Sequence, residues 1–258
     1  MISHIPTFRS KLAEGKVCLG ASVTLNDPVV TEVLSNAAEF LWIDTEHCPM
    51  GMETLVGHLI AARAGGAPAL VRVPGSEVSF IKRVLDSGAE GLIVPQVRSA
   101  AEVESIVQAC RYPPKGSRGW GPRRPTNYGE LSFDDYMVDA NERLFVAVQI
   151  ENLDAVRELD GILAVEGLDA IALGPNDLSG SMGKLCQLDD PEVETVIQQV
   201  VDKARAAGKP VGTGMDTDAD GAVRFAEMGI QWIQVGCDFS YMLKCAKELF
   251  SEIRGRVV

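Results

Sequence analysis

Short apolar runs alternate with amphipathic segments from one end of the chain to the other. The apolar runs are rich in Val, Ile, Leu and Ala, and such runs are typical of buried parallel strands. They predict strands at Val17–Leu25, Phe40–Asp44, Ala69–Val73, Gly91–Val97, Phe145–Ile150, Ala170–Leu173, Pro210–Gly214 and Trp232–Gly236. The segments between them repeat apolar residues at helical spacing. They predict helices at Pro28–Ala38, Met52–Ala64, Glu77–Ser87, Ala101–Arg111, Leu153–Val165, Pro191–Ala207, Ala219–Met228 and Tyr241–Ile253.

The count and order of these elements indicate the fold class. Many of the expected helices end at a glycine, which a left-handed C-cap favours. These glycines are Gly65, Gly88, Gly167, Gly208 and Gly229. Eight strands that alternate with eight helices in 258 residues fit an α/β fold, a (β/α)₈ TIM barrel that occupies residues 1–258 as one domain. An open doubly wound sheet is the alternative, but no GxGxxG motif follows the first strand, which weakens its dinucleotide-binding form.

One stretch interrupts the alternation. Residues Tyr112–Leu131 are rich in Pro, Gly and Arg and show no clear periodicity. A long irregular loop in a compact domain is usually functional or takes part in oligomer contacts. Because this stretch comes after the fourth expected strand, we expect it at the active-site face of the barrel.

Two carboxylates end neighbouring strands. Glu151 and Asp177 follow strands that flank a single helix, so the strands should pair in a parallel sheet, roughly 4.8 Å apart. Two carboxylates at the same ends of such strands can share a divalent cation, and an oxygen-only ligand set favours Mg²⁺, Mn²⁺ or Co²⁺. Taken singly, Glu151 could instead sit at the start of the next helix, and Asp177 could cap a turn.

Other polar residues occupy the same ends of the strands, where barrel enzymes place their chemistry. They are His47, Arg72, Gln149 and Asp216. Arg72 lies within an apolar strand, and because a lone buried guanidinium is costly, we expect an anionic partner or a ligand oxygen beside it. A histidine such as His47 is, by itself, more often a hydrogen-bonded rim residue than a catalyst. Asp216 is expected to cap a helix.

The segment after the sixth expected strand adds an anion site. Gly174 lets the backbone turn sharply before Pro175, Asn176 and Asp177, and N–H groups exposed in such a turn bind anions. A small carboxylate could lie across them while its neighbouring keto oxygen reaches the cation. An α-keto acid fits this arrangement, because one carboxylate oxygen and the C2 oxygen chelate an ion in a five-membered ring.

Composition narrows the class of partner. The net charge is −12 and the isoelectric point about 4.8, which argues against nucleic acid or an anionic membrane as the main partner. The apolar stretches are too short for a transmembrane helix, and no signal peptide is evident, so we expect a cytoplasmic protein. The six cysteines lack a CxxC pair and zinc-site spacing. Cys48, beside His47, is weighed as a nucleophile, but no separate group that would orient the pair is evident.

Together these residues resemble the HpcH/HpaI aldolase family, the metal-dependent class II pyruvate aldolases. The motifs that carry the resemblance are Trp42-Ile-Asp-Thr-Glu-His47, Val71-Arg-Val-Pro74, Leu85-Asp-Ser-Gly-Ala89, Val94-Pro-Gln-Val97, Val148-Gln-Ile-Glu151, Gly174-Pro-Asn-Asp177-Leu-Ser179 and Val211-Gly-Thr213. They extend over nearly the whole chain. Each is short, and their combination is specific.

The resemblance implies roles at the matching positions. Glu151 and Asp177 would bind the metal, and His47 would act as the base through a metal-bound water. Asp86 would raise the basicity of that histidine, although its place near the end of a helix is also typical of a solvated residue. Arg72 would stabilise charge on the C2 oxygen in the transition state.

The resemblance also implies substrate contacts and an assembly. Gln149, with Gly174, Pro175 and the backbone of Asn176 and Asp177, would contact the substrate. Asn176 departs from the small apolar residue common at this position, which is silent if only its backbone is used. Similar proteins form hexamers, as trimers of dimers, with exchanged C-terminal helices. The C-terminal helix is therefore expected to pack on another subunit.

The implied reaction is reversible aldol chemistry on 4-hydroxy-2-oxo acids, which gives pyruvate or another 2-oxo acid and an aldehyde. Oxaloacetate decarboxylation, a tandem aldol or Diels–Alder-like coupling and acyl-CoA lyase chemistry are alternatives on the same enolate. A CoA groove would need cations, for which the sequence offers Arg118, Arg123 and Arg124. Otherwise the stretch around these arginines is expected to shape the acceptor end of the site. A non-catalytic binding barrel is the alternative from another class.

Overall fold

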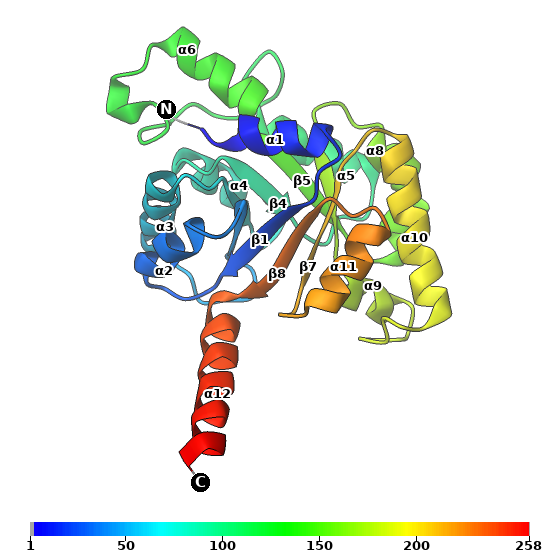
Figure 1. Ribbon diagram of the computed structural model, residues 1–258. Helices are drawn as coiled ribbons and strands as arrows, with labels where there is room; N and C mark the ends of the chain where they lie inside the picture. The colour runs from blue at the N-terminus through cyan, green and yellow to red at the C-terminus, as the bar shows by residue number, and fades with distance from the viewer. Residues whose placement is uncertain (1–2, 258) are drawn as a thin grey trace.

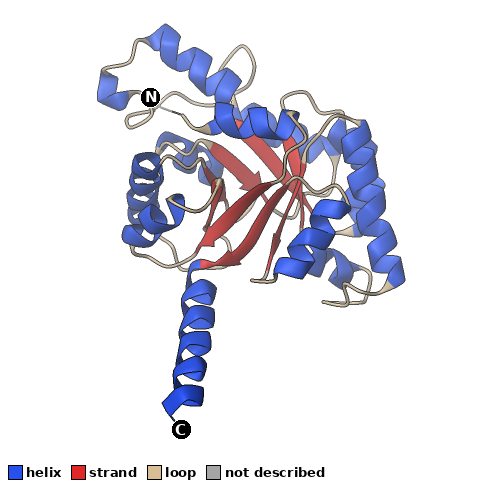
Figure 2. Cartoon of the chain, in the orientation of Figure 1, coloured by secondary structure: helices blue, strands red, loops and turns tan. Residues whose placement is uncertain are grey.

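The eight strands close into a parallel barrel in chain order. The computed structural model describes residues 3–257, and each strand pairs with the next while β8 pairs with β1 (Figures 1 and 2). The strands are β1 (Cys18–Val23), β2 (Phe40–Asp44), β3 (Ala69–Arg72), β4 (Gly91–Val94), β5 (Phe145–Ile150), β6 (Ala170–Leu173), β7 (Val211–Met215) and β8 (Trp232–Cys237). Each corresponds to a predicted strand, so the expected (β/α)₈ TIM barrel is confirmed.

Most of the helices match predicted ones, but the sequence pattern did not indicate α1, α6 and α9. The α-helices of the described residues are α1 (Ile5–Ala13), α2 (Pro28–Ser35), α3 (Met52–Gly65), α4 (Val78–Asp86), α5 (Ala100–Cys110), α6 (Phe133–Val138), α7 (Leu153–Arg157), α8 (Leu159–Leu163), α9 (Pro175–Ser181), α10 (Pro191–Ala206), α11 (Ala219–Glu227) and α12 (Asp238–Val257). The helix expected at Leu153–Val165 is interrupted at Glu158, whose backbone is not helical. The unexpected helices α1, α6 and α9 are short, so they contain little periodicity to detect.

Helix α1 closes the amino end of the barrel. Its buried side chains Ile5, Phe8 and Leu12 join an apolar cluster inside the barrel. The ring of Phe8 lies 5.3 Å from that of Phe40 and 5.5 Å from that of Phe145, the first residues of β2 and β5. Each such aromatic pair is worth about 0.5–1.5 kcal/mol beyond its buried area. Because apolar side chains fill the amino end of the barrel, a ligand would enter the barrel from the carboxyl end.

Residues 112–143, between α5 and β5, form an excursion that lies at the amino end of the barrel, beside α1 (Figure 1). Arg118 donates to Asp86 at the end of α4, and Arg124 donates to the carbonyl oxygens of Ser87 and Leu59. The expectation that the stretch Tyr112–Leu131 lies at the active-site face is therefore wrong for a single chain. The stretch follows α5, and each helix returns the chain to the amino end.

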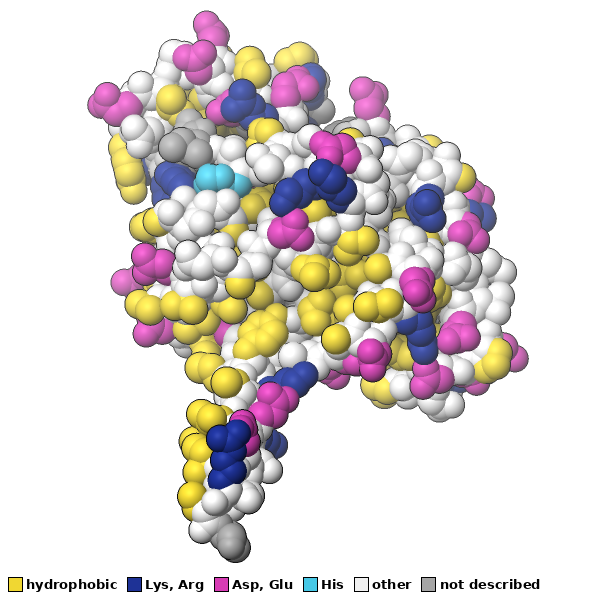
Figure 3. All heavy atoms as spheres, in the orientation of Figure 1, with side chains coloured by type: hydrophobic (Ala, Val, Ile, Leu, Met, Phe, Trp, Pro, Cys, Tyr) yellow, Lys and Arg dark blue, Asp and Glu magenta, His cyan; other side chains and the backbone are white. Residues whose placement is uncertain are grey.

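Helix α12 projects away from the barrel (Figures 1 and 3). It follows β8 without a loop, and its apolar side chains lie exposed along one side: Phe239, Met242, Leu243, Leu249, Phe250 and Ile253. An apolar groove of about 720 Å³ lies beside β1, where residues of α2 and α11 line it. No helix within residues 3–257 is long and apolar enough to cross a membrane.

Candidate active site

A polar cavity of about 300 Å³ opens at the carboxyl end of the barrel. Its lining includes His47, Arg72, Gln149, Gly174, Pro175, Asn176 and Asp177, together with Ser22, Trp42, Asp216 and Gln234. Most of the residues predicted to act on a substrate therefore line one cavity. Asp216 was expected to cap a helix, but the N-cap of α11 is Asp218, and Asp216 lines the cavity instead.

Glu151 lies behind the cavity wall and is 3% exposed. Its carboxylate accepts hydrogen bonds from the Gln96 backbone N–H at 2.6 Å and from the Gln149 side chain at 3.0 Å. Burial, together with the nearby charges of Glu46 and Asp177, raises the pKa of Glu151 to about 7, against the opposing effects of the Gln96 hydrogen bond and of Arg72. A buried carboxylate among other acids is an environment that a bound cation would stabilise.

Gly174 allows β5 and β6 to bring their acids together. A Cβ atom at this position would lie 2.4 Å from Oε2 of Glu151, so any side chain there would displace the carboxylate. Helix α9 begins at the next residue, with Pro175 in its first turn, where the missing N–H costs nothing. Asp177 also lies in that first turn and faces the cavity. The turn expected at Gly174–Asp177 is therefore the start of a short helix.

Arg72 is held by two carboxylates. Its Nε and Nη2 atoms each donate to Asp44 at 2.9 Å, and Nη1 lies 3.2 Å from Glu46. Its guanidinium also lies over the Trp42 ring, 5.6 Å from the ring centre. Burial alone would lower the pKa of Arg72, but Asp44 and Glu46 more than offset this and raise it. The anionic partners expected for this arginine are therefore Asp44 and Glu46.

His47 stands on the loop after β2 with 66% of its side chain exposed. Its Nε2 lies 3.6 Å from Oε2 of Glu46, which is only 14% exposed. Asp86 is the last residue of α4, and its carboxylate pairs with the Arg118 guanidinium at 2.7 Å. Because α4 runs back to the amino end, Asp86 and His47 lie at opposite ends of the barrel within one chain.

The charges around the cavity are unbalanced. Asp177 and Asp216 line it, and Asp44, Glu46 and Glu151 lie directly behind Arg72 or Gly174. Within the described chain, Arg72 is the one Lys or Arg side chain in the lining. No group of three or more His, Cys, Asp and Glu residues suited to a metal occurs among residues 3–257. A cation at Glu151 and Asp177 would therefore need oxygen ligands from water or substrate.

Three contributors to the site had no assigned role in the sequence interpretation. Asp44 and Glu46 fix Arg72, and Gln96 donates its backbone N–H to Glu151. Gln96 has a φ of 58°, a left-handed conformation that is uncommon outside glycine. Such strain costs on the order of 1–3 kcal/mol and clusters at functional sites. Asp44 and Glu46 lie in the His47 motif, so their position beside that histidine was the available signal.

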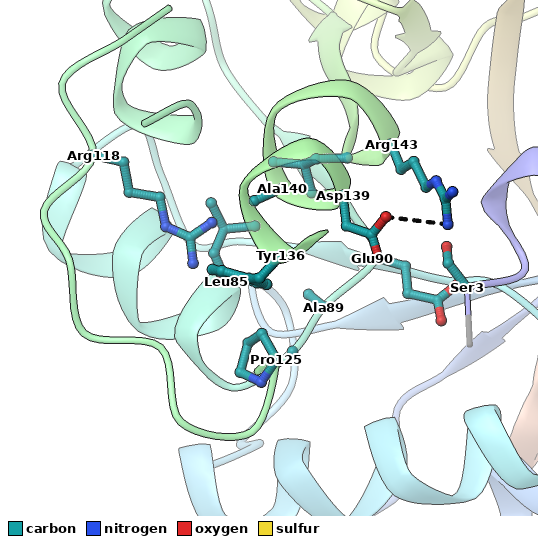
Figure 4. A pocket seen from close by; sticks show the side chains of 12 residues that line it. Ser3, Leu85, Ala89, Glu90, Arg118, Pro125, Tyr136, Asp139, Ala140 and Arg143 are labelled. Carbon is teal, nitrogen blue, oxygen red and sulfur yellow. Dashed lines mark ion pairs between the residues drawn. The ribbon is translucent and has the colours of Figure 1, made fainter. Parts of the chain in front are cut away.

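A second pocket lies at the other end of the barrel, under the excursion (Figure 4). Glu90 lies next to Ser3 on one side, and Arg118 lies on the opposite side. Arg143 pairs with Asp139 at 3.1 Å along its upper wall. None of the residues predicted to bind metal or substrate lines this pocket. It is a packing gap beneath the excursion.

Glu90 in this pocket gives the stability of the fold a pH dependence. Burial raises the pKa of Glu90 above its ordinary value of 4.5, although the His4 amide and the charges of Arg63 and Arg124 oppose the shift. Its contribution to stability is complete below pH 4.5 and is lost as the pH rises through the native pKa. Relative to Glu90→Gln, wild type should therefore lose unfolding free energy as the pH rises above 4.5. Denaturant titrations over this range measure the difference, with the exposed Glu104→Gln as control; a difference that is independent of pH would contradict it.

Comparisons with known proteins point to one family over nearly the whole chain. The model of the HpcH/HpaI aldolase/citrate lyase family matches residues 23–244. A hydroxypyruvate/pyruvate aldolase of Pseudomonas aeruginosa is 36% identical over 249 residues, which are 96% of this chain and 92% of that relative. A 5-keto-4-deoxy-D-glucarate aldolase of Shigella sonnei is 36% identical over 244 residues, 94% of each chain. The crystal structure of an HpcH/HpaI aldolase/citrate lyase family protein from Burkholderia cenocepacia matches with a TM-score of 0.89 at 29% identity, over 96% of this chain and 99% of that one.

Proposed function

Because the chain belongs to the HpcH/HpaI aldolase/citrate lyase family, we propose that it cleaves 4-hydroxy-2-oxo acids reversibly into pyruvate and an aldehyde. The observation that carries this proposal is the convergence of Asp177 and Arg72 on one cavity, with Glu151 directly behind its wall. Relatives at 36% identity are named as pyruvate and 5-keto-4-deoxy-D-glucarate aldolases. We propose the aldol reaction that these relatives have in common and do not specify the aldehyde.

Glu151 and Asp177 would hold a divalent cation, Mg²⁺, Mn²⁺ or Co²⁺. The residues fit such an ion, because Glu151 is buried among other acids with Arg72 as the one Lys or Arg in the described cavity lining. When bound, the cation would act as a Lewis acid on the C2 carbonyl of a chelating 2-oxo acid. Hard oxygen ligands, few in number, favour these ions over zinc.

The remaining residues position the keto acid and handle charge. Gln149 and the backbone at Asn176 and Asp177 would contact the substrate, next to Gly174 and Pro175, all of which line the cavity. Arg72 would stabilise negative charge that develops on the C2 oxygen. One preorganised donor of this kind is worth about 3–4 kcal/mol in the transition state. Asp44 keeps the guanidinium in place for this role through two hydrogen bonds.

His47 would act as the base. In the condensation direction it takes a proton from C3 of pyruvate, directly or through water, and the electrons of that C–H bond form the enolate that attacks the aldehyde. In cleavage, the base takes the proton of the C4 hydroxyl, the C3–C4 bond breaks as the aldehyde carbonyl forms, the electrons of that bond form the same enolate, and a proton then returns to C3. The exposure of His47 at the cavity mouth suits an exchange of protons with solvent.

Asp86 could raise the basicity of His47 only from a second chain, because the two residues lie at opposite ends of one barrel. We propose a homo-oligomer, a hexamer built as a trimer of dimers, in which the C-terminal helix α12 is exchanged between subunits. The exposed apolar side of α12 and the apolar groove beside β1 support this exchange. The excursion, which carries Arg118 beside Asp86, would then reach a neighbouring site and not its own.

The alternatives differ in what they need from the site. Oxaloacetate decarboxylation would use Arg72 and the cation but requires no base to remove a proton. An acyl-CoA lyase would need a cationic groove, and Arg118 and Arg124 are buried at the amino end, at 5% and 7% exposure. They do not form such a groove beside the cavity of their own chain. Aldol chemistry uses a base, His47, in addition to Arg72 and the cation.

The proposal is tested by measuring pyruvate release from a panel of 4-hydroxy-2-oxo acids. With Mn²⁺ or Mg²⁺ present, pyruvate should appear at a rate that a coupled lactate dehydrogenase assay follows. EDTA should lower this rate by at least about 100-fold, and added metal should restore it. Full activity in the chelator would reject the metal assignment, and no turnover on any member of the panel would reject the aldolase.

A further inference from the structure

Glu46 links the two functional side chains of the site. One oxygen, Oε2, lies 3.2 Å from Nη1 of Arg72 and 3.6 Å from Nε2 of His47. Its side chain is 14% exposed, whereas that of His47 is 66% exposed. The half-buried Glu46 carboxylate therefore lies between Arg72, which is also half-buried, and the exposed His47 at the mouth of the cavity.

Asp44 makes the hydrogen bonds that orient Arg72, and Glu46 adds an ion pair at Nη1. Asp44 already receives hydrogen bonds from Nε and Nη2, both at 2.9 Å, and this fork-to-fork arrangement fixes the plane of the guanidinium. The Trp42 ring supports the same plane from one face. Arg72 in turn anchors Oε2 of Glu46, the same oxygen that lies 3.6 Å from Nε2 of His47.

His47 has no other side-chain partner within the described residues. A general base works only when its nitrogen is held within hydrogen-bond reach of the proton it takes, and such contacts are often longer before a substrate binds. At 3.6 Å, Oε2 of Glu46 lies just beyond hydrogen-bond distance of Nε2 of His47, and a small rotation of the exposed imidazole would form the hydrogen bond. The motif order Asp44-Thr-Glu46-His47 thus supplies one carboxylate for the arginine and one for the histidine.

We propose that Glu46 is the positioning residue for His47, and this inference rests on the proposed aldolase function. Its carboxylate holds the imidazole through Nε2 and stabilises the positive charge that the ring gains when it takes the proton from C3 of the keto acid. The C–H electrons remain on the substrate as the enolate, and the proton leaves the ring for the aldehyde oxygen or for solvent. Glu46 acts from the same chain as His47, in addition to any contribution that Asp86 makes from a second chain.

The test compares two reactions of the metal-loaded enzyme that share Arg72 but differ in the need for a base. Exchange of the methyl protons of pyruvate in D₂O requires proton removal, whereas oxaloacetate loses CO₂ by cleavage of a C–C bond. In Glu46→Gln, which keeps the shape and removes the charge, the exchange rate should fall by about 10- to 100-fold. The loss in exchange should exceed the loss in decarboxylation by at least about tenfold.

A double-mutant cycle separates positioning from a structural effect. In a His47→Asn background, Glu46→Gln should cause no further loss of exchange, because the group that it positions is absent. Equal losses in both reactions, or additive losses in the cycle, would show that Glu46 acts through Arg72 and would overturn the inference. Glu53→Gln, in the first turn of α3, controls for the loss of a nearby acid. A wild-type enzyme without either reaction would instead reject the proposed function.

Discussion

Glu151→Gln is expected to abolish measurable metal binding while leaving the metal-free fold intact. The proposed site offers only two protein ligands, so the loss of one carboxylate leaves Asp177 alone. Replacement of groups that merely orient a ligand costs about 10- to 100-fold in metal affinity, and a ligand itself should cost at least as much. Glutamine keeps the acceptor for the Gln96 N–H and removes a charge that burial disfavours. The unfolding temperature without metal should therefore stay the same or rise.

Isothermal titration with Mn²⁺ and thermal unfolding with and without metal measure these two effects. Wild type should bind the ion and gain stability from it by mass action, whereas Glu151→Gln should do neither. Asp216→Asn is the matched control, because Asp216 lines the same cavity but is not a proposed ligand. Metal binding that survives in Glu151→Gln would contradict the two-carboxylate site. A variant that unfolds earlier without metal would show that Glu151 also supports the fold.

The barrel could be predicted because its strands are buried on both faces. The run Phe145–Ile150 was expected at the same residues that the structure shows, since a continuous apolar segment leaves few alternatives. Helix α9 was missed because Gly174-Pro175 is typical of a turn, although proline is equally suited to the first turn of a helix. Helix α1 was missed because its packing partners, Phe40 and Phe145, which contact Phe8, are remote in the sequence.

The sequence predicted those site residues that lie at the ends of strands. The position of Glu151 and Arg72 follows from barrel topology, whereas side chains on loops have no such rule. Glu46 follows the end of β2, and only the structure brings its carboxylate between Arg72 and His47. The Gln96 backbone N–H donates to Glu151 because Gln96 has a positive φ, and no sequence pattern predicts that conformation for a glutamine.

Removal of residues 242–258, most of α12, is expected to convert the oligomer into single chains. The truncation keeps Asp238, which accepts hydrogen bonds from Thr24 and Leu25, and Tyr241, which packs on the core. It removes exposed apolar side chains that each stabilise an interface by about 1.5–3 kcal/mol when fully buried. Light scattering after gel filtration should give a multiple of 27.7 kDa for wild type and one shortened chain for the truncation.

Point variants separate helix exchange from an unrelated contact. Leu249→Asp and Phe250→Asp place charges on the apolar side of α12 and should mimic the truncation, whereas Lys247→Asp should not. Because α12 follows β8 without a loop, it cannot turn back along its own barrel, so the groove beside β1 is available to the helix of another chain. If the groove and α12 belong to one interface, Val223→Asp, at an exposed position of the groove lining, should also release single chains. A wild-type chain that is already monomeric would refute the exchange, and with it any action of Asp86 on His47.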